Sequence, residues 1–403
     1  MAELLQRRRF CSSSGEDPTL DSPERTASQS DTAPLRPPVW VDTPAALHDL
    51  IQDLSRQTRL GVDTESNSLY AYRERVCLIQ FSTPETDYLV DPLALDDLSP
   101  LGVIFADPNI EKVFHAVEYD LLCLRRDFHF TFANVFDTMH AARVLGYPKV
   151  GFDALLKCFF NLHLDKRFQK ANWGKRPLPA HLQKYAQLDT HYLPRLHDHL
   201  YRELAASGRL TLAQEDFCRA CHESIPLSQE LDPQEPWKRF AQHRDLTLRD
   251  LTILRELLAL REQIAAHLDR PPFKVIGDDK LIAIARSQPR SKEELAGLGL
   301  SKPQIARWGS VLLEAVAQGQ QAPLVERRSS PPPKEIILRR LEALKTWRKQ
   351  VAQEMGVASD IVLPRSYLMP LAIHGPQALT SVLADSPTRL ERFGHRILHI
   401  LEV

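Results

Sequence analysis

The sequence lacks a net charge of either sign. Its 51 Lys and Arg residues balance 52 Asp and Glu residues, and the formal charge of the 403-residue chain is -1. A broad positive field that would draw the whole protein to nucleic acid is therefore absent, and phosphate contacts must come from local basic patches. The chain also has no apolar run long enough to cross a membrane and no visible secretory signal. We therefore expect a cytoplasmic protein without membrane contact.

Cysteine is scarce, with six residues in the whole chain. A disulfide framework is not expected in a chain of this length without a signal peptide. The segment Cys218-x-x-Cys221-His222 matches the haem c attachment pattern, but no export route is visible. A zinc half-site would need a second pair of ligands at a usual spacing. We interpret this segment as two thiols on a helix near a domain boundary.

The chain is long enough for two to four domains. Residues 1–37 are rich in Ser, Pro, Thr, Asp and Arg and are predicted to form a disordered tail. Short apolar stretches predict strands at 39–41, 60–65, 76–81, 87–90, 112–115 and 134–136. Because helical patterns alternate with the later strands, we expect an α/β sheet with right-handed crossovers. From residue 236 onward the pattern is helical throughout.

The predicted strand Leu60–Glu65 ends in two carboxylates. Residues i and i+2 of a strand point to the same face, so Asp63 and Glu65 should project together. Two adjacent carboxylates repel each other unless one is protonated or a cation lies between them. Ligation by oxygen alone suits Mg²⁺ or Mn²⁺. The alternative interpretation is a solvated turn after a strand, and a metal site requires further carboxylates at the same place.

Further carboxylates occur at two helices. Asp120 lies near the start of a predicted helix, where an acidic residue also suits the helix dipole. Asp137 is a similar case, and for it we predict only a capping role. Tyr185 and Asp189 are four residues apart and therefore share one helical face. They could form a metal ligand and a neighbouring hydroxyl that handles the attacking water, or a plain surface pair.

A basic stretch with interleaved aromatic residues precedes Tyr185. Cations hold phosphates and aromatic faces stack on bases, so this mixture predicts contact with single-stranded nucleic acid. The alternative is a solvated loop whose Trp packs on the core. The candidate binding residues are Lys166, Arg167, Lys170, Trp173, Lys175 and Arg176.

Four short motifs stand in order along the first half of the chain: Asp63-Thr64-Glu65, His115-Ala116-x-x-Tyr119-Asp120, Asn172-Trp173-Gly174-Lys175-Arg176-Pro177-Leu178 and Tyr185-Ala186-x-x-Asp189. Together they resemble the ribonuclease D family of DEDD-type 3′–5′ exonucleases, in its tyrosine-bearing branch. The resemblance implies an RNase H-like α/β exonuclease domain over residues 38–210. It also implies two divalent metal ions, Mg²⁺ or Mn²⁺, held by Asp63, Glu65, Asp120 and Asp189, with Tyr185 completing the catalytic set.

The helical half contains an internal repeat. Arg261, Gln263, Ala265, Val275, Leu281 and Ala285 recur 87 positions later as Arg348, Gln350, Ala352, Val362, Leu368 and Ala372. Both copies resemble the all-α HRDC domain, which often helps to hold nucleic acid in related proteins; packing against the nuclease domain is the alternative. The expected bounds are a linker at 211–235, a first HRDC domain at 236–318, a linker at 319–333 and a second HRDC domain at 334–403.

The expected function is a metal-dependent 3′–5′ exoribonuclease, because phosphodiester hydrolysis needs an activated water and charge stabilisation at the leaving oxygen. The family suggests RNA, and tRNA precursors in particular, as the substrate. We expect a monomer that uses no small-molecule cofactor. Two alternatives are a DNA 3′–5′ exonuclease and a non-catalytic nucleic-acid-binding protein on a nuclease scaffold. The second is disfavoured because all five catalytic candidates are present.

Overall fold

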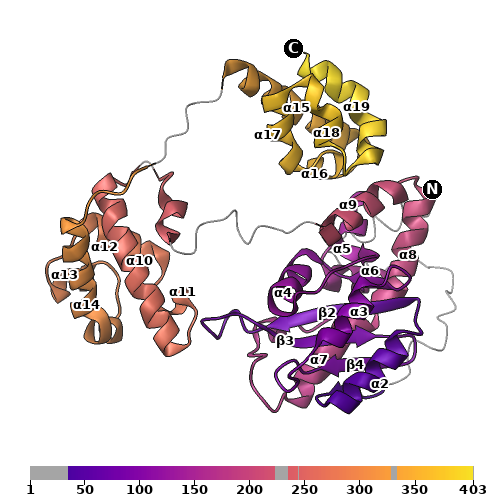
Figure 1. Ribbon diagram of the computed structural model, residues 1–403, viewed down its shortest axis with the longest axis horizontal. Helices are drawn as coiled ribbons and strands as arrows, with labels where there is room; N and C mark the ends of the chain where they lie inside the picture. Colours follow the sequence, from indigo (N-terminus) through magenta and orange to yellow (C-terminus); the bar gives the residue numbers. More distant parts are fainter. Residues whose placement is uncertain (1–34, 223–234, 244, 328–333, 403) are drawn as a thin grey trace, which may run out of the picture. The chain divides into compact units, whose positions relative to one another are not determined.

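The computed structural model describes residues 35–222, 235–243, 245–327 and 334–402 (Figure 1). The predicted disordered tail therefore lies outside the described residues, apart from residues 35–37. Within the described ranges, no helix is long and apolar enough to cross a membrane.

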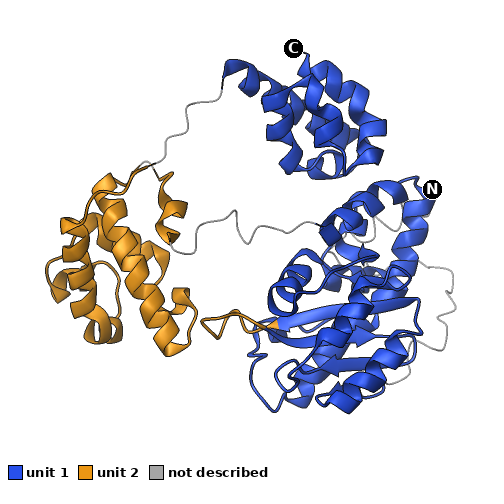
Figure 2. Ribbon diagram, viewed as in Figure 1, with its two compact units in different colours: residues 1–65, 76–224, 333–403 blue, residues 66–75, 225–332 orange. Residues whose placement is uncertain are grey.

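The chain divides into two compact units (Figure 2). One unit contains the α/β region and the C-terminal helices, residues 1–65, 76–224 and 333–403. The other contains a loop of the sheet and the middle helices, residues 66–75 and 225–332.

A six-stranded sheet forms the centre of the first unit, in the order β1-β4-β3-β2-β5-β6. The strands are β1 Val39–Val41, β2 Arg59–Ser66, β3 Val76–Ser82, β4 Asp87–Val90, β5 Glu111–Phe114 and β6 Val135–Asp137. Strand β5 is parallel to both β2 and β6, and β1 is parallel to β4, whereas β3 and β4 are antiparallel. The predicted α/β class is confirmed, and all six predicted strands are present.

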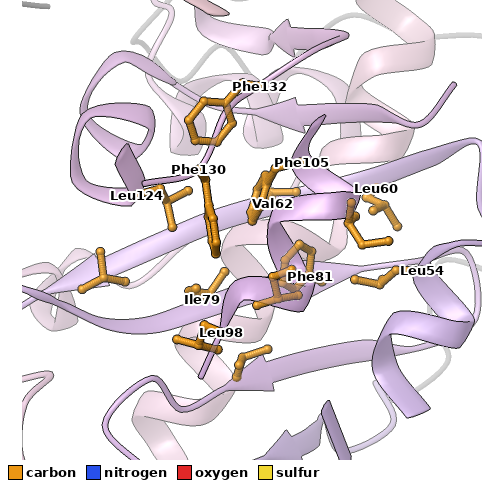
Figure 3. Close-up of a cluster of buried hydrophobic side chains, with 14 of the residues drawn as sticks. Leu54, Leu60, Val62, Ile79, Phe81, Leu98, Phe105, Leu124, Phe130 and Phe132 are labelled. Carbon is orange, nitrogen blue, oxygen red and sulfur yellow. The ribbon is translucent and has the colours of Figure 1, made fainter. Parts of the chain in front are cut away.

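One face of the sheet carries an aromatic core. It is covered by α2 (Pro44–Leu54), α3 (Ser99–Ala106) and α4 (Glu118–Phe128). The ring of Phe105 lies 5.8 Å from that of Phe81 and stacks at 5.3 Å on that of Phe130 (Figure 3). Leu60 and Val62 of β2 point into this core. Because side chains alternate along a strand, the same strand turns Asp63 and Glu65 to the opposite face.

The opposite face is covered by α7 (Ala180–His191), next to β3 and β4, and by a second group of helices. That group consists of α5 Thr138–Leu145, α6 Phe152–Phe160, α8 Leu193–Ala206 and α9 Leu210–His222. The helix α9 corrects the sequence prediction, which placed a linker over residues 211–235. Residues 210–222 form a 13-residue amphipathic helix. Its apolar side chains Leu212, Ala213 and Phe217 are buried in the core of the first unit, which a linker would not provide.

The two predicted HRDC copies share one helical plan. The first has α10 Leu248–Leu268, α11 Pro272–Val275, α12 Asp278–Ser287, α13 Lys292–Gly297 and α14 Lys302–Gln321, preceded by the short helix η3 Pro236–Phe240. The second has α15 Glu335–Met355, α16 Ser359–Val362, α17 Arg365–His374, η4 Pro376–Ala378, α18 Leu379–Val382 and α19 Pro387–Leu401. The first three helices of the two copies are offset by 87 residues at both ends, which is the offset of the sequence repeat.

Equivalent side chains also make equivalent hydrogen bonds in the two copies. The guanidinium of Arg261 donates to the carbonyl of Ile276 at 3.2 Å, and that of Arg348 donates to the carbonyl of Leu363 at 2.8 Å. Donor and acceptor are both shifted by 87 positions. The repeat is therefore present in the contacts as well as in the sequence.

The two copies belong to different units. The second copy packs on the α/β region, where Arg209 of the loop before α9 donates to the carbonyl of Met355 at 2.7 Å and Arg143 pairs with Asp360. The first copy packs with the loop 66–75, where the amide of Tyr72 donates to Asp269 at 3.1 Å. For the second copy, these contacts agree with the packing alternative that the sequence left open.

Candidate active site

The strand β2 and the helix α7 bring three carboxylates together. Asp63 and Glu65 project from β2, and Asp189 projects from α7. One carboxylate oxygen of each lies within 4.8 Å of the others, an arrangement that could hold a metal ion. All three side chains are half-buried, so the group is open to an ion from solvent. Side chains alternate between the two faces of a strand, and Leu60 and Val62 are buried on one face. Asp63 and Glu65 therefore project together from the other face, as predicted.

The fourth predicted ligand, Asp120, is in the first turn of α4 and only 7% exposed. It lies outside the group of three but is held close to β2, because the hydroxyl of Thr64 donates to its carboxylate at 2.5 Å. Its charge also contributes to the raised pKa values of Asp63 and Glu65. The structure thus connects all four acids, three by direct proximity and the fourth through Thr64 and its electrostatic effect.

The surroundings of the acids raise their pKa values. For Asp63 the largest cause is burial, followed by the charges of Asp120, Asp189 and Glu65. Burial also raises the pKa of Asp120 to about 7 and that of Asp189 to about 8. Desolvated carboxylates of this kind hold protons near neutral pH unless a cation replaces them. An all-oxygen donor set with unbalanced negative charge fits a hard divalent ion such as Mg²⁺ or Mn²⁺.

Tyr185 lies beside this cluster, one helical turn before Asp189. Its hydroxyl is hydrogen-bonded to Asp189, and burial together with the charges of Asp189, Glu65 and Asp63 raises its pKa above the ordinary value. Its ring packs near the rings of Trp173 and Phe168, at centroid distances of 6.1 and 5.8 Å. The phenol therefore stays protonated at neutral pH, donates its one proton to Asp189, and can accept a hydrogen bond from a water in the site through its oxygen.

The structure corrects two of the predicted nucleic-acid contacts. Trp173 is 1% exposed and packs with Leu78, Leu178 and Tyr185, so its ring offers no surface for a base. Arg176 forms a bidentate pair with Asp91, at 2.6 and 2.7 Å, and its guanidinium also donates to backbone carbonyls. These two side chains fix the segment to the core beneath the site, which is the alternative considered for the tryptophan.

The remaining basic candidates lie along the η2 turn, Lys166–Lys170, and the segment after it. Arg167, Lys170 and Lys175 are exposed, and the side chain of Lys166 is not described. The guanidinium of Arg167 donates to both carboxylate oxygens of Asp165 at 2.9 Å. An exposed ion pair of this kind is weak and exchanges readily with solvent, so it does not prevent Arg167 from contacting a phosphate.

For Asp137, the sequence predicted one of its two structural roles and missed the other. Asp137 caps α5 as predicted, accepting from the amides of Met139 and His140 at 2.8 and 3.2 Å. It also accepts from the amides of Ala116 and Val117, at 3.0 and 3.2 Å. Those two residues form the turn that leads into α4, so Asp137 orients the helix carrying Asp120. The capping pattern is local and visible in sequence, whereas the second contact spans about 20 residues and is not.

The fold and the acidic cluster define the class of DEDD-type 3′–5′ exonuclease domains. A family model for the 3′–5′ exonuclease domain matches residues 38–205, and the HRDC domain model matches residues 250–316 and 337–401. The acids of the cluster come from β2 and α7, and Asp120 at the start of α4 is linked to them through Thr64.

Curated relatives narrow this class. The chain is 32% identical to ribonuclease D of Gluconacetobacter diazotrophicus, over 71% of this chain and 73% of the relative. The chain belongs to the ribonuclease D family. It is also 33% identical to the exosome complex exonuclease RRP6 of Saccharomyces cerevisiae, over 62% of this chain but only 36% of that protein. The chain thus spans about a third of the length of this relative and of the RRP6-like 3 protein of Arabidopsis thaliana.

A solved structure agrees with this assignment. The crystal structure of Escherichia coli RNase D, described as an exoribonuclease involved in structured RNA processing, is similar with a TM-score of 0.67 and 25% identity. The similarity covers 91% of this chain and 98% of that one. It therefore includes the helical region as well as the sheet.

Proposed function

We propose that this protein is a metal-dependent 3′–5′ exoribonuclease whose catalytic set is Asp63, Glu65, Asp120, Tyr185 and Asp189. The observation that supports this most is the group of three carboxylate oxygens within 4.8 Å, at which burial and, for the two acids of β2, mutual repulsion raise the pKa values. Acids grouped only for packing would leave this repulsion uncompensated.

The metal ligands would be Asp63, Glu65, Asp120 and Asp189, and Mg²⁺ or Mn²⁺ fits their oxygen atoms. Two such ions, when bound, would supply an activated water and neutralise charge at the leaving 3′ oxygen. The chain's own residues have other tasks. The carboxylates set the geometry, and Thr64 holds Asp120 through its hydroxyl.

Tyr185 would orient rather than deprotonate the attacking water. Its phenol is hydrogen-bonded to Asp189, and its pKa lies above the ordinary value because of burial and neighbouring negative charge. With its one proton donated to Asp189, the phenol can orient a water by accepting a hydrogen bond from it, but it is a poor base at neutral pH. The sequence suggested only that Tyr185 handles the attacking water, and the environment of the hydroxyl favours orientation.

The proposed substrate is RNA with a free 3′ end, and tRNA precursors are the specific candidate. The description of the Escherichia coli relative, which names structured RNA processing, supports this choice. The DNA alternative differs by the absence of a 2′ hydroxyl, which is the group that separates the two substrates. A monomeric state, a cytoplasmic location and the absence of a small-molecule cofactor stay predictions.

One experiment tests this function. The chain is incubated with RNA and DNA oligonucleotides of one sequence, each labelled at the 5′ end, in Mg²⁺, in Mn²⁺ and in EDTA. We expect stepwise shortening of RNA from the 3′ end, with no shortening in EDTA. Robust cleavage in EDTA would contradict the metal-dependent mechanism, and faster shortening of DNA would favour the DNA alternative.

A further inference from the structure

The helix α7 is attached to the sheet by a buried carboxylate that lies outside the catalytic set. Asp87, the first residue of β4, is 8% exposed and accepts a hydrogen bond from the Ser82 hydroxyl at 2.6 Å. It also accepts from the side-chain amide of Gln187 at 2.6 Å, and Nδ1 of His191 lies 2.9 Å from it. Two of these three partners are on α7, one on each side of Asp189.

A third residue of α7 joins the same network. The Thr190 hydroxyl lies 2.7 Å from the Ser82 hydroxyl, and Thr190 is fully buried. Because Ser82 donates its one hydroxyl proton to Asp87, it accepts from Thr190. The proton chain therefore runs from Thr190 through Ser82 to Asp87. Three residues within the segment 187–191 are thus fixed to one carboxylate, and Asp189 lies in the middle of that segment.

At Thr190, the residue after Asp189, the backbone of α7 also lies close to the backbone of β2. A Cβ atom added to Gly61 would lie 2.6 Å from the carbonyl oxygen of Thr190, closer than real Cβ atoms come. Gly61 precedes Asp63 by two positions on the same face of β2, and Thr190 follows Asp189 directly. The two halves of the acidic cluster therefore meet where the strand and the helix are packed backbone against backbone.

Asp87 is charged in this environment. Burial would raise its pKa, but hydrogen bonds from His191, Ser82 and Gln187 outweigh burial and hold the pKa below the ordinary value. Hydrogen bonds to a charged acceptor are about twice as strong as neutral ones. A buried network of this kind, with every member satisfied, is rigid and costly to disturb.

We propose that Asp87 is a positioning residue for the metal centre, which fixes the rotation and height of α7 so that Asp189 and Tyr185 face Asp63 and Glu65. The inference rests on the proposed metal-dependent function. It concerns placement only, since Asp87 is not among the carboxylates grouped closely enough to hold a metal ion. A displacement of about 1 Å at a catalytic group can cost about 10²-fold in rate, so a loosened α7 should affect both metal binding and turnover.

The test compares two variants of the full chain. Asp87→Asn keeps the shape of the side chain but removes its charge and replaces one acceptor with a donor. Asp53→Asn is the matched control, because Asp53 accepts from the hydroxyl of Tyr88 at 2.7 Å. Tyr88 follows Asp87 on β4 and points to the opposite face, toward α2 and not α7.

Mn²⁺ binding is measured by electron paramagnetic resonance, and the kinetics are measured on a short RNA at saturating Mn²⁺. For Asp87→Asn we expect Mn²⁺ affinity to fall about tenfold, as for other residues that orient metal ligands. We expect kcat to fall about tenfold while KM for RNA stays within about twofold, because the RNA contacts are untouched. Asp53→Asn should leave all three quantities within about twofold of the unmutated chain.

Several outcomes would overturn the inference. Unchanged Mn²⁺ affinity and kcat in Asp87→Asn would show that α7 keeps its place without this carboxylate. Equal losses in Asp53→Asn would show a general loosening of the fold. If Asp87→Asn does not fold, Ser82→Ala removes the shared hydroxyl and receives the same measurements, and unchanged Mn²⁺ affinity in that variant would overturn the inference. Failure of the unmutated chain to bind Mn²⁺ would instead refute the proposed function.

Discussion

Two groups of carboxylates in the same unit differ in whether cationic side chains of the protein pair with them. At the candidate active site, Asp63 and Asp189 lie beside other acids, and their pKa values are raised by burial and, for Asp63, by neighbouring negative charge. On α9, Glu215 and Asp216 are buried as well, but Arg389 of the second HRDC domain pairs with both, at 3.1 and 2.8 Å. Arg389 is itself fully buried.

The difference appears in the pKa of Asp216. Burial would raise it, but His140 and Arg389 outweigh burial and lower it well below the ordinary value. The pKa of Glu215 remains raised, because there burial exceeds the effect of Arg389. The protein's own cations thus compensate the burial of Asp216 fully and that of Glu215 in part. Carboxylates grouped without such compensation, as at the active site, are the ones that an external cation would complete.

The largest expected effect comes from removing a carboxylate at the active site. Asp63→Asn should lower kcat/KM on a short RNA by about 10³-fold or more, because it deletes a proposed metal ligand. Affinity for the RNA, measured by fluorescence anisotropy in Ca²⁺, should change by less than about threefold, because phosphate contacts elsewhere on the protein are retained. Substantial residual activity would place Asp63 outside the metal centre. Asp63 would then not be an acid that needs an external cation, and it would no longer differ from Asp216 in this respect.

The next largest effect should be on stability and should come from the compensated group. Arg389→Met leaves the buried Glu215 without its cation and leaves Asp216 with only His140 and Arg219, and breaking a buried pair in this way costs about 3–5 kcal/mol. We expect the urea midpoint of the first unit to fall accordingly. Asp189→Asn serves as the control, since it should not lower that midpoint in EDTA. A variant Arg389→Met as stable as the unmutated chain would show that the pair does not compensate these acids.

Tyr185→Phe should have an intermediate effect on activity and little effect on stability. The ring still packs near Trp173, and only the hydroxyl beside Asp189 is lost. We expect kcat to fall about 10²-fold if the hydroxyl orients the attacking water. Mn²⁺ affinity should stay within about threefold, because the carboxylates are unchanged. An unchanged kcat would assign Tyr185 to packing alone.

The smallest expected effect is a gain in stability with a defined pH dependence. In EDTA, Asp189→Asn should raise the Tm of the first unit at pH 8.5 by a few degrees, about 2–4 °C per kcal/mol. The folded-state pKa of Asp189 is about 8, above its ordinary value, so the folded chain binds more protons than the unfolded chain between about pH 4 and pH 8. Stability of the unmutated chain therefore falls as pH rises through that window, and the advantage of the Asp189→Asn variant should be smallest near pH 4. Equal Tm differences at both pH values would contradict the raised pKa.

Local spacing accounted for much of the site. The period of two placed Asp63 and Glu65 on one face, the i, i+4 spacing paired Tyr185 with Asp189, and the 87-residue repeat placed the helices of the second copy. The errors concern contacts between distant positions. Arg176 pairs with Asp91, 85 residues away, and Arg389 pairs with Glu215, 174 residues away. The sequence of a basic stretch does not indicate which of its cations will pair with a distant carboxylate. The sequence of a single helix such as α9 likewise does not indicate on which surface the helix packs.

The most direct test of the central claim is a calorimetric titration of Mn²⁺ into the metal-free chain near neutral pH, repeated in buffers of different ionisation enthalpy. The pKa values of Asp120 and Asp189, about 7 and about 8, mean that binding must displace protons at this pH. The account predicts saturable binding with net proton release, which diminishes toward about pH 9 and is abolished together with binding in Asp63→Asn. Binding without proton release, or binding that survives in Asp63→Asn, would contradict the claim that these acids form a metal centre.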